Sequence, residues 1–129
     1  MPQKEVVLPV GGAKPLAPYS PGIQFGNLLI TSGQVGLDPE FQSMVEGGVQ
    51  AQARQVMLNL GSILDAAGCS YEHILKCTVF MTDMNDYAAI NDIYGEFFPN
   101  DPPARSAVAV KALPAGALVE IEAIAYLPE

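Results

Sequence analysis

The sequence predicts an α+β fold in which two helices cover one face of a mixed six-stranded sheet. Two long segments repeat apolar residues at the 3.6-residue period of a one-sided helix. Six shorter segments are rich in Val, Ile, Leu or Thr and are bounded by Gly, Pro or Asp, which is the pattern of strands. Their order, ββ(β)αβαββ, is typical of an α+β plait. Because no repeat or linker interrupts this order, we expect one domain over residues 1–129.

The predicted strands are short, and two of the connections between them have recognisable turn sequences. Gly26 and Asn27 separate two strands as a two-residue hairpin loop does. The sequence L-P-A-G-A at 113–117 is typical of a longer turn between the last two strands. The predicted strands are Glu5–Leu8, Ile23–Phe25, Leu28–Ser32, Ile74–Met81, Arg105–Val110 and Leu118–Tyr126.

Each predicted helix has an apolar stripe and recognisable ends. The first covers Val49–Ala67, where Gln, Arg, Asn and Asp occupy the side away from the stripe and Gly68 marks the C-terminal stop. The second covers about Asn85–Phe98, with Asp83 as the N-cap and Pro99 at its end. Both helices are one-sided, so both are expected to pack on the sheet.

Alternation along the last strand separates an apolar face from a mixed face. The apolar face, on which the helices should pack, consists of Val119, Ile121, Ala123 and Ala125. The mixed face consists of Leu118, Glu120, Glu122, Ile124 and Tyr126. Two helices leave this second face open, and a chain that is 50% hydrophobic and 16% charged favours apolar surface hidden between subunits. We therefore expect the mixed face to pack against other copies of the chain, with Arg105 and Glu120 where subunits meet.

Charge and composition limit the classes of partner. Fourteen acidic against six basic residues give a net charge of −8, which repels phosphate backbones and disfavours nucleic-acid binding. No run approaches the roughly 18 apolar residues of a membrane span, so no membrane partner is expected. The first residues lack the apolar core of a signal peptide, and two cysteines do not make a disulfide framework. We expect a cytoplasmic protein, with mitochondrial location as the alternative.

Arg105 is the one basic side chain that the sequence singles out for chemistry. Only Lys76 lies close before it, and the 34 residues from Cys77 to Val110 contain no other Arg or Lys. An arginine presents a planar fork of donors suited to bidentate capture of a carboxylate. A nearby glutamate, Glu120 or Glu122, has the chemistry of a general base. The alternative is that Arg105 and one of these glutamates form an ion pair between subunits.

No metal site is predicted from the remaining candidate ligands. Cys69, His73 and Cys77 provide three zinc-capable side chains, but their spacing is wider than in zinc motifs and a fourth ligand is missing. Cys77 is better explained as a small core residue. The sequence D-M-N-D at 83–86 lacks the glycine and glutamate that a calcium loop requires, so it is interpreted as a helix start.

Short motifs spread over nearly the whole chain carry a family resemblance. They are A-P-Y-S at 17–20, L-L-I-T-S-G-Q-V-G at 28–36, A-A-G at 66–68, K-C-T-V-F at 76–80, D-M-N-D-Y at 83–87, P-A-R-S at 103–106 and V-E-I-E-A-I-A at 119–125. Together they resemble the Rid family of reactive-intermediate deaminases, also called the YjgF family. The combination of P-A-R-S with the terminal E-I-E-A-I-A is the specific part of this resemblance.

The resemblance implies a chorismate-mutase-like fold that forms a homotrimer, with three sheets facing inward as a central barrel and three sites between subunits. It implies hydrolysis of 2-imino acids, such as 2-iminopropanoate and 2-iminobutanoate, to 2-oxo acids and ammonia, without a cofactor or metal. Arg105 would bind the substrate carboxylate, and Glu120 would hold or activate the attacking water. The pocket would be lined by Tyr19, Ser32, Gly33 and Asn91, and the backbone of Ala107 would contact the imine nitrogen.

Three residues depart from the family pattern and are expected to reshape the pocket. Ala107 stands where many relatives have cysteine, Pro102 where an aromatic residue precedes P-A-R-S, and Ala17 where a glycine precedes P-Y.

Two other functions also fit the resemblance or the apolar clefts. They are an endoribonuclease that inhibits translation and a small-ligand-binding or holdase-like protein without turnover.

The residues carried over to the pocket each have a simpler structural interpretation. Tyr19 would pack at the subunit boundary, and Ser32 would satisfy the end of a strand. Asn91 would be a surface residue or a cap to a neighbouring loop, because it lies on the solvent-leaning side of the second helix.

Overall fold

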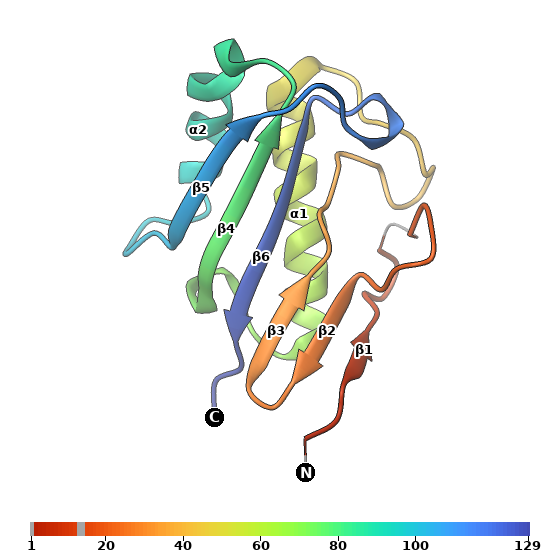
Figure 1. Cartoon of the computed structure of the whole chain (residues 1–129), viewed down its shortest axis with the longest axis vertical. Helices are drawn as coiled ribbons and strands as arrows, with labels where there is room; N and C mark the ends of the chain where they lie inside the picture. Colours follow the sequence, from red (N-terminus) through yellow and green to blue (C-terminus); the bar gives the residue numbers. More distant parts are fainter. Residues whose placement is uncertain (1, 13–14) are drawn as a thin grey trace.

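A computed structural model describes residues 2–12 and 15–129, and it confirms the predicted α+β fold (Figure 1). Two α-helices lie on one face of a six-stranded mixed sheet. Neither helix in the described ranges is long and apolar enough to cross a membrane. The elements in chain order are β1 (Glu5–Val7), β2 (Gly22–Phe25), β3 (Leu28–Thr31), α1 (Gly48–Ala67), η1 (Tyr71–His73), β4 (Ile74–Met81), η2 (Met84–Asp86), α2 (Tyr87–Gly95), β5 (Ala104–Ala109), η3 (Pro114–Gly116) and β6 (Val119–Tyr126).

The sheet order β1-β2-β3-β6-β4-β5 places the last strand of the chain between β3 and β4. β4 and β5 run parallel, whereas the other neighbouring strands are antiparallel. Parallel neighbours require a crossover connection, and α2 supplies it between β4 and β5. The edge strand β5 therefore lies beside α2, and the two elements together position Arg105 (Figure 1).

The second helix is shorter at both ends than the predicted Asn85–Phe98. Asp83 does accept a hydrogen bond from the backbone N–H of Asn85, at 2.9 Å, but it caps the 3₁₀ turn η2 rather than α2. At the other end, the N–H groups of residues 96–98 bond to carbonyls three residues back, so the last turn tightens and α2 ends at Gly95. The predicted bounds were wrong because a 3₁₀ turn has a similar apolar spacing over so few residues.

The core lies between α1 and the sheet, as the alternation predicted. The inward residues of β6, namely Val119, Ile121, Ala123 and Ala125, are at most 2% exposed. Burying a large aliphatic side chain contributes about 1.5–3 kcal/mol, so this layer is a main source of stability. Its fully buried members include Leu29, Val56, Met57, Leu60, Ile63, Val79, Val119 and Ile121.

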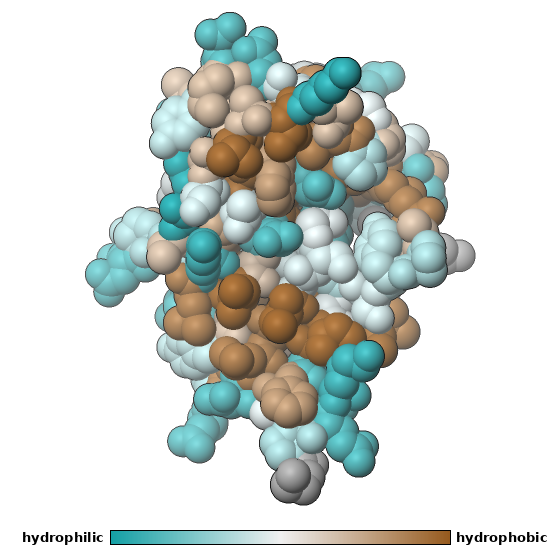
Figure 2. All heavy atoms as spheres, viewed as in Figure 1, coloured by the Kyte–Doolittle hydropathy of each residue, from teal (hydrophilic) through white to brown (hydrophobic). Residues whose placement is uncertain are grey.

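The opposite face of the sheet carries exposed apolar side chains in neighbouring strands. Ile30 is 50% exposed and pairs with Ile124, which is 39% exposed. Leu28 and Tyr126 form the next pair on this face of the same two strands, and both are exposed as well. Figure 2, viewed onto this face, shows a brown band across the lower half of the sheet. We call these four residues the open-face patch.

Glycine at position 61 is required by close packing between α1 and η1. A Cβ there would lie 2.2 Å from the hydroxyl oxygen of Tyr71, which donates a hydrogen bond to the carbonyl of Met57 at 2.7 Å. We therefore expect Gly61→Ala to destabilise the chain by about 1–3 kcal/mol through overpacking, although alanine is normally the better helix former. Urea unfolding at a fixed protein concentration measures the change.

Gly95 provides the matched control for this substitution. A Cβ at Gly95 in α2 would meet no atom within 4 Å. Gly95→Ala should therefore be neutral or stabilising by up to about 1 kcal/mol. If Gly61→Ala and Gly95→Ala changed the free energy of unfolding equally, the packing explanation would be contradicted.

Candidate active site

The guanidinium of Arg105 lies on the helix side of β5, where α2 supplies its partners. It donates one hydrogen bond from Nη1 to Oδ1 of Asn91, at 2.8 Å, and another from Nη2 to the hydroxyl of Tyr87, at 3.0 Å. Its Cζ atom also lies 4.9 Å from the ring centroid of Tyr94 and 5.5 Å from that of Tyr87. We call Arg105, Asn91, Tyr87 and Tyr94 the arginine half-site.

Arg105 has no carboxylate partner in the described part of the chain. The ion pairs found there join Arg54 to Glu96 and His73 to Glu72. A guanidinium has five N–H donors, and the two hydrogen bonds of Arg105 engage two of them with neutral acceptors. The remaining donors suffice for bidentate binding of one carboxylate.

Glu120 lies in a pocket of about 420 Å³ on the other side of the sheet. Four of the residues predicted for the site line this pocket, namely Tyr19, Ser32, Gly33 and Glu120. We call these four the glutamate half-site. Arg105, Asn91 and Ala107 do not line the pocket. The residues predicted for one shared site therefore lie in two separate places within a single chain.

Local contacts hold the walls of the glutamate half-site. The hydroxyl of Ser32 donates to the carbonyl of Ser20, at 2.6 Å, and so joins the end of β3 to the segment that carries Tyr19. The hydroxyl of Tyr19 in turn accepts a hydrogen bond from the backbone N–H of Leu16, at 3.1 Å. The strand-end interpretation of Ser32 is thus correct, and it also fixes the position of the pocket wall.

Gly33 allows the carboxyl group of Glu120 to approach the backbone closely. A Cβ at Gly33 would lie 2.7 Å from the carboxyl carbon Cδ of Glu120 and 2.9 Å from Oε2. Any other residue would force the carboxylate to shift, because such contacts are shorter than van der Waals packing allows. The glycine in this motif is therefore explained by the position of Glu120.

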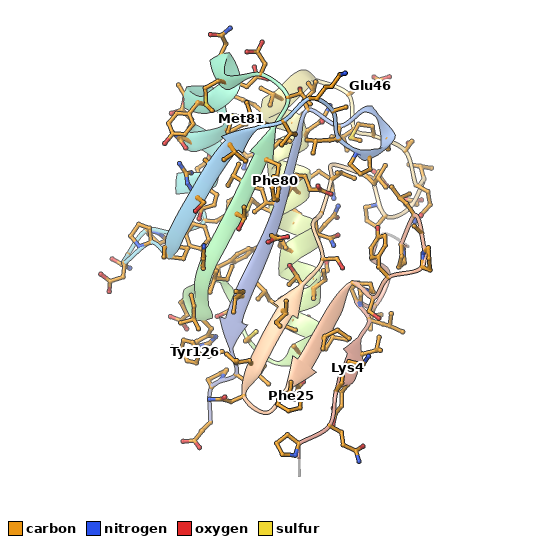
Figure 3. The ribbon with its side chains drawn as sticks, viewed as in Figure 1. Lys4, Phe25, Glu46, Phe80, Met81 and Tyr126 are labelled. Carbon is orange, nitrogen blue, oxygen red and sulfur yellow. The ribbon has the colours of Figure 1, made fainter. Side chains whose placement is uncertain are left out.

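Burial raises the pKa of Glu120 above its ordinary value of 4.5, and the negative charge of Glu122 raises it further. Both glutamates alternate outward on β6, so they lie on the same face of the strand. Phe80 is the register partner of Glu120 and lies near the upper end of β4 in Figure 3. The carboxyl group is thus placed in partly apolar surroundings, which favour its neutral form.

Arg105 and Glu120 of one chain cannot contact the same small molecule. Cys77 is the β4 partner of both Arg105 on β5 and Ala123 on β6, so Arg105 lies level with Ala123, three residues from Glu120. Standard sheet spacings then offset the two Cα atoms by about 10 Å across the strands and about 10 Å along them. Their side chains also leave opposite faces of the sheet, since Arg105 meets α2 and Glu120 faces away from α1.

Ala107 and Asn91 belong with Arg105 rather than with the pocket. Ala107 is half-buried, packs against the main core and pairs with Val79 in the register of the sheet. Asn91 is half-buried and bonded to Arg105, so the interpretation of Asn91 as a simple surface residue is wrong. Tyr87 and Tyr94 were not predicted as site residues, although both lie on one face of α2 at helical spacing from Asn91.

Two buried amides on α1 were also missed. Asn59 donates through Nδ2 to the carbonyls of Val35, at 3.1 Å, and Leu37, at 3.0 Å, and these two residues line the pocket. The Oε1 atom of Gln52 accepts from the N–H of Leu118, at 2.8 Å, at the start of β6. Both side chains are at most 7% exposed, although the sequence placed Gln and Asn on the polar side of the helix.

Comparison with known proteins identifies the family. A sequence profile described as Endoribonuclease L-PSP matches residues 11–127. The structure also superposes on a protein of the conserved Rid family from Yersinia pestis with a TM-score of 0.93 and 40% sequence identity, covering 97% of this chain and 100% of that chain. The chain belongs to the Rid family. The predicted resemblance is thereby confirmed.

Other relatives of this Rid-family chain carry more specific names. A RutC family protein of Pyrococcus horikoshii is 46% identical over 123 residues, covering 95% of this chain and 98% of the relative. A mouse protein named 2-iminobutanoate/2-iminopropanoate deaminase is 49% identical over 110 residues, covering 85% of this chain and 82% of the relative. Escherichia coli TdcF, solved with bound serine, has a TM-score of 0.91 and 38% identity, covering 96% of this chain and 99% of that chain.

The surroundings of Glu120 generate a titration prediction. We expect ¹³C NMR titration to give Glu120 a pKa above 4.5, and Glu122→Gln to lower that pKa only in part, because burial is the larger cause. A raised folded-state pKa means that stability falls as pH rises through this range. Glu120→Gln should therefore be more stable than wild type at neutral pH, and this difference should shrink as the pH falls toward 4.5 and level off below it.

Glu72→Gln is the control for this titration, because Glu72 lies in η1 away from the pocket and should leave the pKa of Glu120 unchanged. A wild-type pKa at or below 4.5 would show that a cation outside the single chain outweighs burial at Glu120.

Proposed function

We propose that this Rid-family chain hydrolyses 2-imino acids, such as 2-iminobutanoate and 2-iminopropanoate, to 2-oxo acids and ammonia. The proposal depends chiefly on Arg105, a guanidinium held by neutral acceptors with donors left for a carboxylate. The deaminase name of the mouse relative, and of a human relative at 43% identity, supports this substrate class.

The arginine half-site is suited to the carboxylate that every 2-imino acid carries. Charge-assisted hydrogen bonds from a guanidinium are the strong ones, and its two-pronged geometry orients the bound group as well as holding it. The serine bound in the TdcF structure also has an α-carboxylate, which is consistent with such an anchor in a relative. Because the two acceptors of Arg105 are uncharged, a substrate anion would meet no competing carboxylate from the described residues.

Glu120 is proposed to activate the attacking water. The carbon of a protonated imine is already electrophilic, so the reaction mainly requires a positioned water and one base. Glu120 would accept a proton as the water oxygen bonds to that carbon, forming a carbinolamine. Return of that proton to nitrogen makes ammonia the leaving group. As the C–N bond breaks, Glu120 accepts the hydroxyl proton of the carbinolamine, and the 2-oxo acid and ammonia are released. The proposed hydrolysis requires no electron transfer and therefore no redox cofactor.

The complete site is proposed to form between subunits of a homotrimer. Arg105 and Glu120 act on one substrate in the proposal, yet one chain directs them to opposite faces of its sheet. A neighbouring copy packed on the open-face patch would bring its own Arg105 toward this chain's Glu120. Three such contacts, related by a three-fold axis, would close the inward sheets into a barrel and cover Ile30 and Ile124.

The departures from the family pattern bear on substrate preference in this proposal. Ala17 lines the same pocket as Glu120, so its methyl group narrows the space that a glycine would leave. Ala107 offers no thiol, and only its backbone is available for a contact to the imine nitrogen. Pro102 precedes β5 and is exposed. We propose that these changes adjust which imino acid is preferred and leave the anchor and the base in place.

Substitution of the two charged residues provides the test of function. Each imine would be generated in solution by an amino-acid oxidase and trapped with semicarbazide, so that the loss of trapped product reports hydrolysis. We expect Arg105→Ala to lower kcat/KM by about ten- to a hundredfold, as for lost hydrogen bonds to a charged group. Glu120→Gln should lower kcat by about 10²–10⁴-fold, as for a lost general base. Wild-type activity should also fall as acid protonates Glu120.

Arg54→Ala is the matched control, because Arg54 pairs with Glu96 on the exposed helix surface and should not affect turnover. Wild type that leaves imine lifetimes unchanged would refute the hydrolase and favour a ligand-binding or holdase-like protein. RNA cleavage that survives further purification, and that is lost in Arg105→Ala, would favour the endoribonuclease in its place.

The trimer is tested separately by light scattering. Wild type should have three times the 13.7 kDa mass of one chain. Ile124→Asp should give a folded monomer, because a buried unpaired charge at an interface is costly whereas an exposed one is tolerated. Catalysis should disappear together with the trimer.

Leu58→Asp is the control, since Leu58 is 48% exposed on α1 and lies away from the open-face patch. Wild type that scatters as a monomer at micromolar concentration would contradict the assembly.

A further inference from the structure

We propose that Tyr94 is a positioning residue whose ring holds the guanidinium of Arg105 in the orientation that receives the substrate carboxylate. The inference rests on the proposed anchoring role of Arg105, but it concerns a residue that neither the motifs nor the pocket identified. Its basis is the arrangement of three residues: Arg105 and Cys77 are paired on neighbouring strands, and Tyr94 of α2 places its ring against Arg105 and its hydroxyl beside Cys77.

The closest aromatic contact of the guanidinium is with Tyr94. Cζ of Arg105 lies 4.9 Å from the centroid of the Tyr94 ring, within the range of a cation–π interaction. Burial raises the pKa of both Tyr94 and Cys77, and the positive charge of Arg105 opposes that rise in each. The ring therefore separates the cation from the core and supplies an electron-rich surface to it.

Tyr94 is much better fixed than the other ring at the half-site. It is 6% exposed, and its ring packs against that of Phe98 at 4.8 Å between centroids. Tyr87, by contrast, is 40% exposed and contacts Arg105 mainly through its hydroxyl. A ring fixed in the core can set the plane of a guanidinium, whereas an exposed ring moves with it.

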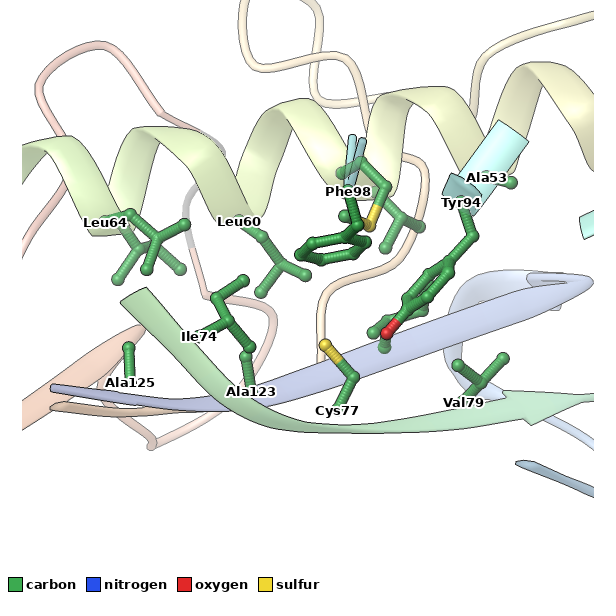
Figure 4. Packing of buried hydrophobic residues seen from close by; sticks show 14 of the residues in the cluster. Ala53, Leu60, Leu64, Ile74, Cys77, Val79, Tyr94, Phe98, Ala123 and Ala125 are labelled. Atoms are coloured by element: carbon green, nitrogen blue, oxygen red, sulfur yellow. The ribbon is translucent and has the colours of Figure 1, made fainter. Parts of the chain in front are cut away.

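The hydroxyl of Tyr94 gives a second, independent observation. It is the one buried side-chain polar atom without a hydrogen-bond partner in the part of the chain that the structure describes. Figure 4 shows the hydroxyl directed toward the sheet, beside the sulfur of Cys77. Burial raises the pKa of Tyr94 and the Cys77 thiol raises it further, but the hydroxyl of Tyr94 has no hydrogen-bond partner among the described residues. Tyr94 therefore contacts Arg105 through its ring and not through its hydroxyl.

Together with the acceptors on α2, the ring restricts the guanidinium on three sides. Asn91 and Tyr87 fix two of its N–H groups, and Tyr94 covers one of its faces. Long arginine side chains lose substantial rotamer entropy when they bind a ligand. Holding Arg105 before the ligand arrives removes part of that loss, which is the benefit of pre-organisation.

The experiment compares the wild-type chain with two variants, Tyr94→Leu and Tyr94→Phe. The sequence has only two arginines, so ¹⁵N-arginine labelling gives Nε–H signals for Arg105 and for Arg54 as an internal reference. In wild type we expect the Arg105 signal to be shifted upfield by the ring current. Tyr94→Leu should move it toward the Arg54 signal, while Tyr94→Phe should keep it. Binding of 2-oxobutanoate, measured by calorimetry, should weaken about three- to thirtyfold in Tyr94→Leu only.

Ile90→Ala separates positioning from loss of helix packing. Ile90 lies on α2, is 1% exposed and is not one of the hydrogen-bond or ring partners of Arg105, so its truncation loosens the same helix without removing the ring. It should lower thermal stability at least as much as Tyr94→Leu, yet leave the Arg105 signal and 2-oxobutanoate affinity near wild type. In turnover, Tyr94→Leu should raise KM with little change in kcat.

The outcomes are distinct. Equal weakening by Ile90→Ala and Tyr94→Leu would overturn the inference, as would wild-type affinity in Tyr94→Leu or a wild type with no shifted Arg105 signal. Wild type that binds no 2-oxo acid would overturn it as well. Wild type that binds 2-oxobutanoate in a Tyr94-dependent way but hydrolyses no imine would refute the proposed function and support the inference.

Discussion

The period-two alternation of β6 is the constraint on which the core and both half-sites depend. Its inward residues, such as Val119 and Ile121, are fully buried under α1, while its outward residues include Glu120 and two members of the open-face patch, Ile124 and Tyr126. A shift of one residue in register would expose the core face and bury the two glutamates, so the register is strongly determined. Because β4 pairs with both β6 and β5, the same register also fixes the height of Arg105.

The electrostatic arrangement follows from this separation of faces. Among the described residues, the arginine has only neutral acceptors, and Glu120 has a carboxylate neighbour rather than a cation. Neither group has a partner of opposite charge in this part of the chain, so each is left available to a ligand or to another subunit. A salt bridge between Arg105 and Glu120 in one chain would have satisfied both groups and removed this reactivity. The fold prevents it by distance as well as by direction.

Buried polar groups on the helices give the half-sites their fixed shape. Asn59 holds the segment that forms the pocket wall, and Gln52 holds the start of β6 through the N–H of Leu118. Each such hydrogen bond contributes about 0.5–1.5 kcal/mol, and leaving one of these buried groups unpaired would cost more. The pocket is thus built from the helix side of the sheet although it opens on the other side.

The sequence by itself determined the two-helix, six-strand order, the apolar face of β6 and the family motifs that select Arg105 and Glu120. The order and the apolar face follow from local periodicity and turn chemistry, which depend on neighbouring residues only, whereas the roles of Arg105 and Glu120 follow from the family resemblance. The tertiary structure decided that Arg105 turns toward α2, that Asn91, Tyr87 and Tyr94 surround it, and that Glu120 lies in a separate pocket. Alternation assigns residues of one strand to two faces, but it cannot say which face of β5 meets the helices. That choice requires the parallel pairing of β5 with β4 and the crossover through α2, both of which are contacts between segments distant in sequence.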